Sequence, residues 1–258
     1  MNEPDLRGTV ALVTGGTRGL GLATGVALGR AGAHVWLTHR WGSADEAAVA
    51  ARFAEAAAPA PTIVEADIAD DDASDLVLRR IADVHARLDV LVANVCVAAV
   101  GGDLSAWRRR DLQRCLTASA WSLPRDVDAC RRILGTAPAR VVVMSSDGVV
   151  THHPGYDYVA LAKAALEATA RQLDLEGVTR THVVRTRQAL TGGFEDIFDA
   201  PTRATLERYR RFAVSAEQAA SVVVACVCGQ LDAIRSQPIQ VDHGASWADN
   251  VLTARRVA

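Results

Sequence analysis

Short runs of β-forming residues alternate with segments of helical spacing over almost the whole chain. Apolar runs at residues 9–13, 34–38, 62–65, 90–95, 140–144, 182–185 and 239–241 predict strands. Helical patterns cover residues 20–29, 44–58, 71–87, 107–134, 159–175 and 216–229. Because alternating strands and helices form right-handed crossover units, the strands should be parallel. The pattern predicts an α/β fold, a doubly wound parallel sheet in a single domain over residues 1–258.

The composition is that of a globular protein and excludes several partners. Of the 258 residues, 50% are apolar and 22% charged, and the net charge of −2 gives no field that attracts nucleic acid. No apolar stretch is long enough to span a membrane, and the first residues lack the pattern of a secretory signal. Five cysteines without framework spacing predict a reduced, cytoplasmic protein, and no metal-ligand spacing is present.

A glycine-rich turn follows the first expected strand and opens the first expected helix. It reads TGGTRGLG from residue 14 to residue 21. Glycines permit a tight turn and close backbone approach, and the helix N-terminus offers free N–H groups to a pyrophosphate. This context predicts a dinucleotide site in a Rossmann fold. The expected cofactor contacts in the turn are Thr14, Gly15, Thr17, Arg18, Gly19, Leu20 and Gly21.

The same turn resembles the short-chain dehydrogenase/reductase superfamily, whose nucleotide motif is TGxxxGxG. The resemblance extends over nearly the whole chain, including LDVLV at residues 88–92 and VDHG at residues 241–244. It implies that Asp67 and Ile68 lie at the adenine and that Asn94 and Thr191 also contact the cofactor. The resemblance further implies a homotetramer or homodimer, assembled through the helices near residues 107–134 and 159–175.

The end of the second expected strand bears on which cofactor binds. It reads Thr38-His39-Arg40, and no acidic residue follows before Asp45. An acidic residue there would bind the ribose 2′-hydroxyl of NAD, whereas Arg40 and Arg18 could hold a 2′-phosphate. The resemblance therefore favours NADPH. The alternative is that both arginines are solvated surface residues of an arginine-rich chain.

The catalytic motif departs from the usual Asn, Ser, Tyr and Lys of the superfamily. Ser146 takes the Ser position and Lys163, the single lysine among 28 basic residues, takes the Lys position in KAALEA. The Tyr position of YxxxK holds Val159, and the Asn position falls near Cys115. The NNAG tetrad reads ANVC at residues 93–96, and the Pro-Gly after the sixth strand is replaced by Thr-Arg at residues 186–187.

Two tyrosines lie close to Lys163. Tyr156 gives the spacing Y-x6-K, which resembles the NADPH-using type III enoyl-acyl-carrier-protein reductases. A Tyr at this spacing could reach the carbonyl oxygen of an unsaturated substrate and stabilise an enolate. Tyr158 could instead be a displaced acid of a ketoreductase. His152 or His153 could donate a proton, although exposed loop histidines fit the pattern better; Cys115 fits buried helix packing better than a nucleophile.

Three functions stay open from the sequence. The favoured one is NADPH-dependent reduction of a C=C bond in a small-molecule or thioester-bound substrate, in specialised metabolite biosynthesis. The second is reduction of a carbonyl by an atypical ketoreductase. The third is a cofactor-binding pseudoenzyme or partner subunit. Residues 192–211, which include Phe194 and Phe198, could form an apolar lid over the substrate or a surface helix packed on the core.

Overall fold

The computed structural model describes residues 4–42, 44–97, 99, 101–153, 155–187 and 213–248. Within these residues one sheet of seven parallel strands has the order β3-β2-β1-β4-β5-β6-β7. The sequence prediction of an α/β fold with a doubly wound parallel sheet is confirmed. The strands are β1 (Val10–Val13), β2 (His34–His39), β3 (Thr62–Glu65), β4 (Val90–Ala93), β5 (Arg140–Ser146), β6 (Arg180–Thr186) and β7 (Pro238–Val241).

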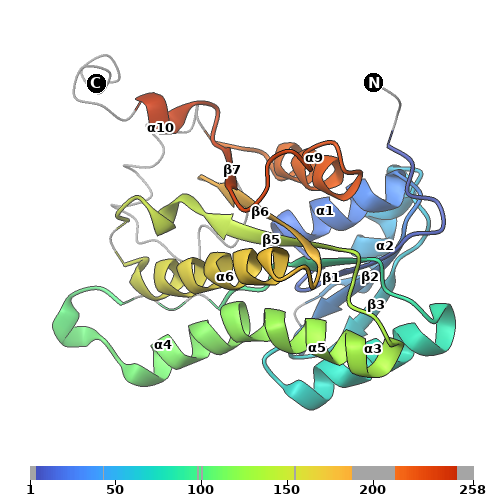
Figure 1. The fold of residues 1–258 in the computed structure, drawn as a ribbon, viewed down its shortest axis with the longest axis horizontal. Coiled ribbons are helices and arrows are strands. Elements are labelled where there is room, and N and C mark those ends of the chain that lie inside the picture. Colours follow the sequence, from blue (N-terminus) through green and yellow to red (C-terminus); the bar gives the residue numbers. More distant parts are fainter. Residues whose placement is uncertain are drawn as a thin grey trace.

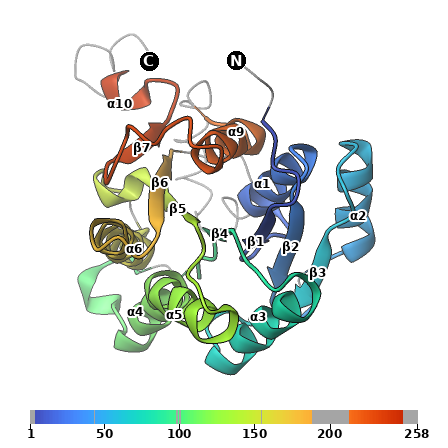
Figure 2. The same ribbon diagram turned by 45° about the vertical axis from the view of Figure 1, so that its right-hand side comes forward.

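Helices cover both faces of the sheet (Figures 1 and 2). One face carries α1 (Gly19–Arg30), α2 (Glu46–Glu55) and α9 (Ala216–Val227). The other carries α3 (Asp71–His85), α4 (Arg109–Leu116), α5 (Ser122–Leu134) and α6 (Asp157–Leu175). A short helix, α10 (Ala245–Ala248), follows β7, and no helix in this part of the chain is long and apolar enough to cross a membrane.

The alternation of side chains along a strand explains why the central strands β1 and β4 are apolar at every position. In β1, Val10 and Leu12 join the core under α3, α5 and α6, whereas Ala11 and Val13 join the core under α1, α2 and α9. Successive residues of a strand point to opposite faces, so a sheet covered on both sides needs apolar residues at every position. Loss of either helical layer would therefore expose one complete face of these strands.

The helix expected over residues 107–134 is confirmed for residues 109–134, which are helical without a gap but change helix type along the way. A 3₁₀ turn at Leu104–Ala106 precedes α4, and a π-helical segment at Thr117–Trp121 joins α4 to α5. In this segment the Ser122 hydroxyl donates to the main-chain oxygen of Ala118 at 2.9 Å. A hydroxyl bonded back to the preceding turn often bends a helix, and here that bond lies at the junction of the π-helical segment with α5.

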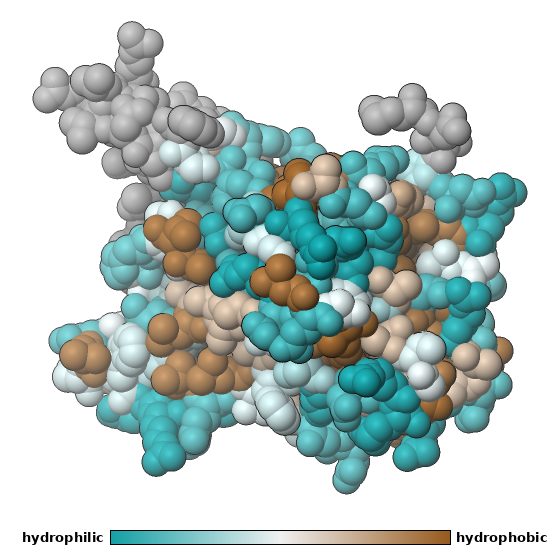
Figure 3. All heavy atoms as spheres, in the orientation of Figure 1, coloured by the Kyte–Doolittle hydropathy of each residue, from teal (hydrophilic) through white to brown (hydrophobic). Residues whose placement is uncertain are grey.

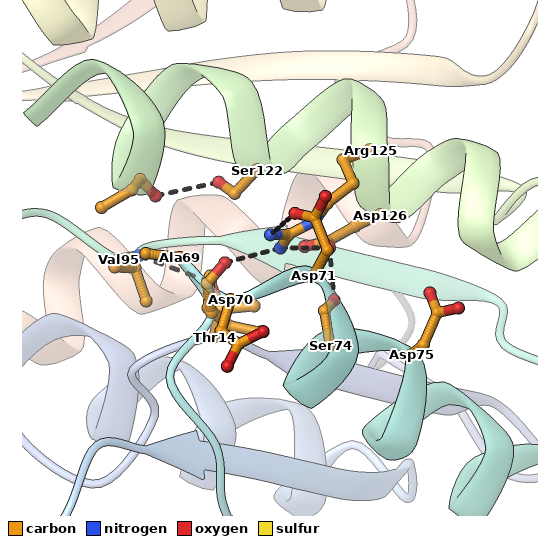
Figure 4. A network of polar contacts seen from close by, with 12 residues as sticks. Thr14, Ala69, Asp70, Asp71, Ser74, Asp75, Val95, Ser122, Arg125 and Asp126 are labelled. Carbon is orange, nitrogen blue, oxygen red and sulfur yellow. Dashed lines mark hydrogen bonds and ion pairs between the residues drawn. The ribbon is translucent and has the colours of Figure 1, made fainter. Parts of the chain in front are cut away.

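A buried ion pair fastens α5 to the loop before α3 (Figure 4). Arg125 donates to Asp126 Oδ1 at 2.7 Å, to Asp71 Oδ1 at 2.9 Å and to the main-chain oxygen of Ile68 at 2.6 Å. Asp126 also accepts a hydrogen bond from Ser74 at 2.6 Å. Burial raises the pKa of Asp126, and the charge of Arg125 opposes that shift. The network positions the loop that carries Asp67 and Ile68.

Candidate active site and cofactor site

The glycine-rich turn lies where the strand order reverses, with β2 on one side of β1 and β4 on the other. In such sheets ligands bind outside the carboxyl ends of the strands at this point. Gly15 has φ +61° and donates to Thr38 Oγ1 at 3.1 Å. At Gly21 a Cβ atom would lie 2.4 Å from the main-chain oxygen of Gly15. The turn is therefore a cradle that side chains at these positions would fill.

The start of α1 leaves main-chain N–H groups for an anion. Arg18, the residue before the helix, has an extended backbone and makes no side-chain capping bond. The first turn of α1 holds no acidic residue. Free N–H groups and the helix dipole favour a phosphate at such an end. Together with the glycine cradle, this geometry fits the pyrophosphate of a dinucleotide.

Asn94 holds the glycine-rich turn against the end of β4. Its side-chain amide donates to the main-chain oxygens of Thr14 at 3.0 Å and Gly15 at 3.1 Å. The Thr14 hydroxyl in turn accepts from the Asn94 main-chain nitrogen at 3.1 Å. Asn94 thus shapes the cradle in this structure, which is a supporting role for a residue expected to contact the cofactor.

Two residues expected at the adenosine half of the cofactor lie next to each other. Arg40 Nη1 is 3.8 Å from Asp67 Oδ2, and the Arg40 guanidinium lies 5.5 Å from the ring centre of Trp41. Arg40 and Arg18 are both exposed, as a contact with a 2′-phosphate requires. Ile68 is buried with its carbonyl bound to Arg125. Thr17 is buried and Leu20 half-buried at the turn itself.

Lys163 is buried beside the end of β5. Only 5% of the residue is exposed, and Nζ donates to the main-chain oxygen of Met144 at 2.6 Å. Burial lowers the pKa of Lys163, while nearby acidic groups, including Glu167, oppose the shift. Its position on α6 at the carboxyl ends of the strands fits the anchoring of a ribose hydroxyl.

Tyr156 lies on the same edge of the sheet, immediately before α6. Its ring packs on Gly148, where a Cβ atom would come within 2.6 Å of two ring carbons. Burial raises the pKa of Tyr156 above its ordinary value, and a hydrogen bond with the Ser146 side chain opposes that shift. The Ser146 hydroxyl also accepts from the main-chain nitrogen of Gly148 at 3.1 Å. The fold thus brings together Ser146 and Tyr156, and it places Lys163 at the end of the same strand.

Asp147 is a candidate site residue that sequence reasoning missed. Its carboxylate is buried, lies 3.2 Å from His153 Nε2 and lies 3.2 Å from Arg187 Nε. The expectation that both loop histidines are exposed is confirmed for His152 and wrong for His153, because Asp147 draws that ring inward. Asp147 directly follows Ser146 at a strand end, which was the available signal. The His153 ring also meets Tyr156 edge-on at 6.0 Å.

Tyr158 lies in the packing between α4 and α6. It is 1% exposed, its ring is 5.4 Å from that of Trp107, and its hydroxyl accepts a hydrogen bond from the main-chain nitrogen of Arg108. Two residues along a helix rotate the side-chain direction by about 200°, so Tyr158 points away from the face of Tyr156 and Lys163. This environment suits a structural role better than that of a displaced acid.

The remaining predicted positions are placed as follows. Val159, at the usual Tyr position, is fully buried. Cys115 is buried too, and burial raises the pKa of its thiol to about 11, which fits helix packing and not a nucleophile. Thr191 and the possible lid at residues 192–211 lie outside the described residues. Among the residues that are described, no group of three His, Cys, Asp or Glu side chains could hold a metal.

A glycine-cradled turn at the switch point, with a tyrosine, a serine and a lysine near a neighbouring strand end, fits an oxidoreductase of the short-chain dehydrogenase/reductase type. More narrowly, the chain belongs to the family described as enoyl-(acyl carrier protein) reductase, whose model matches residues 15–246.

Individual relatives agree with this class. The short-chain dehydrogenase/reductase FrzI of a Cladobotryum species is 30% identical over 177 residues, which cover 65% of this chain and 64% of FrzI, less than two thirds of that relative. A 3-oxoacyl-[acyl-carrier-protein] reductase of a Synechocystis strain is 29% identical over 181 residues, covering 67% and 72%. The crystal structure of a short chain dehydrogenase from Burkholderia cenocepacia in complex with NADP superposes with a TM-score of 0.79 at 26% identity, covering 93% and 99%.

Proposed function

We propose that this protein is an NADPH-dependent reductase that reduces an activated C=C bond in an enoyl thioester or enone. The placement of Tyr156 carries the proposal. Its hydroxyl is hydrogen-bonded to Ser146 at the end of β5, seven residues before Lys163. The usual Tyr position is a buried valine, Val159, and the hydroxyl of Tyr158 is bound to main chain.

Tyr156 and Ser146 would act on the carbonyl oxygen of the substrate. NADPH, when bound, supplies the hydride. Its addition to the β-carbon leaves negative charge on that oxygen as an enolate, which preorganised hydroxyl donors stabilise. Because burial raises the pKa of Tyr156, the phenol keeps its proton and acts as a hydrogen-bond donor. A donor that keeps its proton suits an enolate better than an alkoxide, which needs proton transfer.

The cofactor would be held by residues that follow β1, β2 and β3, by Lys163 on α6 and by Thr191. The glycine-rich turn and the start of α1 would bind the pyrophosphate, and Lys163 would bind the nicotinamide ribose. Arg18 and Arg40 would grip the 2′-phosphate, since guanidinium groups form paired bonds with phosphate oxygens. Asp67 and Ile68 would border the adenine, and Thr191 the nicotinamide. The Burkholderia relative binds NADP, which supports the choice of the phosphorylated cofactor.

Carbonyl reduction is the second candidate, and the same hydroxyl pair favours it. Ser146 next to Tyr156 could orient a ketone oxygen and protonate it after hydride transfer. The Synechocystis relative is named as a 3-oxoacyl-[acyl-carrier-protein] reductase. The two reactions differ in product, because one leaves a saturated thioester and the other a hydroxy thioester.

The test is a comparison of matched thioesters with purified protein. NADPH oxidation is followed with a short trans-2-enoyl thioester and with the 3-oxoacyl thioester of equal length, and products are identified by mass spectrometry. Faster turnover of the enoyl substrate, lost in Tyr156→Phe, supports the proposal. Preference for the oxo substrate would replace it with the second candidate. Tight NADPH binding without turnover of either would favour a cofactor-binding partner subunit.

We also propose that the protein assembles with copies of itself through the layer of α4, α5 and α6. Trp121, 57% exposed, and Leu161, 44% exposed, lie on this layer. The space-filling view shows apolar residues gathered on the side that carries α4 and α6 (Figure 3). Exposed apolar groups of this kind mark protein contacts, and the expected assembly is a homodimer or homotetramer in a reducing cytoplasm.

A further inference from the structure

Two cysteines meet beside the candidate site at a single carbonyl oxygen. Cys96 Sγ lies 3.7 Å, and Cys115 Sγ 3.2 Å, from the main-chain oxygen of Val97. The distance between the two sulfur atoms therefore cannot exceed the sum of these two distances. Cys96 is on the loop after β4, whereas Cys115 is on α4, nineteen positions later in the chain. The fold, not local sequence, brings the thiols together.

The two thiols differ in access. Cys96 is exposed, and Cys115 is buried under the same loop. Of the other three cysteines, Cys130 and Cys226 are buried and Cys228 is half-buried, and burial raises the pKa of the Cys130 and Cys226 thiols to about 12. An oxidant in solution would therefore meet Cys96 first, because thiol oxidation follows exposure and thiolate character.

Cys96 also lies among the groups of the candidate site. After burial, the largest influence on the pKa of both Tyr156 and Lys163 is the charge of a Cys96 thiolate, which raises each of them. The same charge raises the pKa of Cys115. Cys96 is also only two residues from Asn94, whose amide holds the glycine-rich turn. A change at Cys96 would act directly on the candidate site.

We propose that Cys96 and Cys115 form a reversible disulfide on exposure to a hydroperoxide, and that this bond switches the site off. The Cys96 thiolate attacks a peroxide oxygen, the O–O bond breaks, and Cys96 becomes a sulfenic acid while hydroxide or alkoxide leaves. Cys115 gives up its proton to that base and attacks the Cys96 sulfur, the S–O bond breaks, and the departing hydroxide takes up from solvent the proton that Cys96 lost on ionising and leaves as water. Two thiols are oxidised by two electrons, and the hydroperoxide is reduced. A dithiol reductant reverses the bond.

Closure of the bond would disturb the cofactor cradle. A disulfide needs sulfurs about 2.05 Å apart, so Cys96 must move toward α4. Only Val95 separates Cys96 from Asn94, whose amide holds the main-chain oxygens of Thr14 and Gly15. Movement of Cys96 would therefore displace Asn94, which holds the glycine-rich turn in place. This consequence rests on the proposed function, whereas formation of the bond does not.

Peptide mapping tests the bond directly. The protein is treated with hydrogen peroxide, free thiols are alkylated, and trypsin releases residues 88–108 and 115–125, each with one cysteine. We expect these peptides joined, at their summed mass less two hydrogens, and separated again by dithiothreitol. Cys115→Ser should abolish the joined species and Cys228→Ser should preserve it. Cys96 recovered only as a higher oxide, or joined to a second copy of its own peptide, would overturn the proposal.

A binding measurement tests the switch separately from catalysis. Fluorescence titration with NADPH is carried out on reduced, oxidised and re-reduced protein. We expect affinity to fall at least tenfold on oxidation and to return with dithiothreitol, with no fall in oxidised Cys115→Ser. Unchanged affinity in a protein shown to contain the bond would overturn the switch. Reduced protein that binds NADPH but turns over no thioester would contradict the proposed function without affecting this result.

Discussion

The ammonium of Lys163 donates a hydrogen bond to the main-chain oxygen of Met144, so the single lysine of the chain is fixed to the strand that ends at Ser146. This contact aligns α6 with β5 and sets where Tyr156 lies relative to the strand end. Tyr156 precedes the helix by one residue, and Ser146 closes the strand. The seven-residue spacing of Tyr156 and Lys163 therefore sets the position of Tyr156, because Lys163 fixes α6 at one place along β5.

Removal of the Tyr156 hydroxyl should abolish most of the activity. Tyr156→Phe keeps the ring on Gly148 but deletes the donor to the substrate oxygen, so we expect kcat/KM to fall by about 10²–10³-fold. NADPH affinity should change less than threefold. Tyr158→Phe is the matched control. It loses a bond to the Arg108 nitrogen, costs about 1 kcal/mol of stability and retains turnover. The reverse pattern would assign the acid to Tyr158.

A methyl group at residue 148 should lower activity, as loss of the Tyr156 hydroxyl does, because it displaces the Tyr156 ring. In Gly148→Ala the new Cβ atom would lie 2.6 Å from Tyr156 ring carbons, so the ring must shift. We expect kcat to fall about tenfold or more, because misplaced donors stabilise charge poorly. NADPH binding, measured by fluorescence, should stay within threefold. An alanine variant as active as the wild type would show that the ring position is unimportant.

Cofactor selectivity should depend on Arg40. Arg40→Ala removes a guanidinium from the proposed 2′-phosphate site, and we expect the Kd for NADPH to rise about tenfold while that for NADH stays within twofold. Arg52→Ala, an exposed arginine on α2, is the control and should change neither value. Equal losses for both cofactors would show that Arg40 supports the adenosine pocket and does not read the phosphate.

Burial of Lys163 predicts a slope in alkaline stability. Because burial lowers its pKa below the ordinary 10.5, the folded state binds fewer protons than the unfolded state between the lowered value and 10.5. The free energy of unfolding should therefore rise with pH across that window. Lys163→Met removes the titration, so denaturant curves of wild type and variant should diverge toward pH 10.5, with the wild type gaining. Curves that stay parallel would contradict the lowered pKa.

The ion pair under α3 and α5 should matter for stability but not for chemistry. Asp126→Ala leaves the buried guanidinium of Arg125 without its nearest partner, and we expect a loss of about 3–5 kcal/mol in denaturant unfolding. Asp128→Ala, whose carboxylate pairs on the surface with Arg132, should cost under about 1 kcal/mol. A small loss at Asp126 would indicate that Asp71 and the Ile68 carbonyl satisfy Arg125 on their own.

Sequence patterns were sufficient to predict the sheet, because residues close together in the chain mark each strand. Every strand contains β-forming residues such as valine and isoleucine within a short run, and β3 occupies the residues expected for it, 62–65. The π-helical segment at Thr117–Trp121 was not predicted, since its residues keep the apolar spacing of an ordinary helix. Arg125 and Asp126, adjacent charges on a helix, resemble a solvated surface until the loop of Ile68 closes over them.

The candidate site could be predicted only in part, because some of its contacts join residues that are far apart in the chain. Motif spacing identified the glycine-rich turn and Lys163, whose neighbours lie close in the chain. It could not pair Asp147 with Arg187, because those residues meet only when β5 and β6 align. Nor could it separate the two tyrosines, which stand two residues apart. Their hydroxyl partners, Ser146 and the Arg108 nitrogen, come from different parts of the fold.

Because the single lysine of the chain, Lys163, is buried, arginine side chains supply the positive charge of the surface. The other 27 basic residues are arginines, so no lysine side chain is available on the surface as a primary amine. Reagents and modifying enzymes that acylate lysine would find no surface side chain to react with. Arginine stays protonated far into alkaline solution, so the surface cations would persist at pH values where a lysine-rich protein loses its own. Amine-directed labelling located at the Lys163 side chain would thus report its exposure, and with it the opening of α6 from β5.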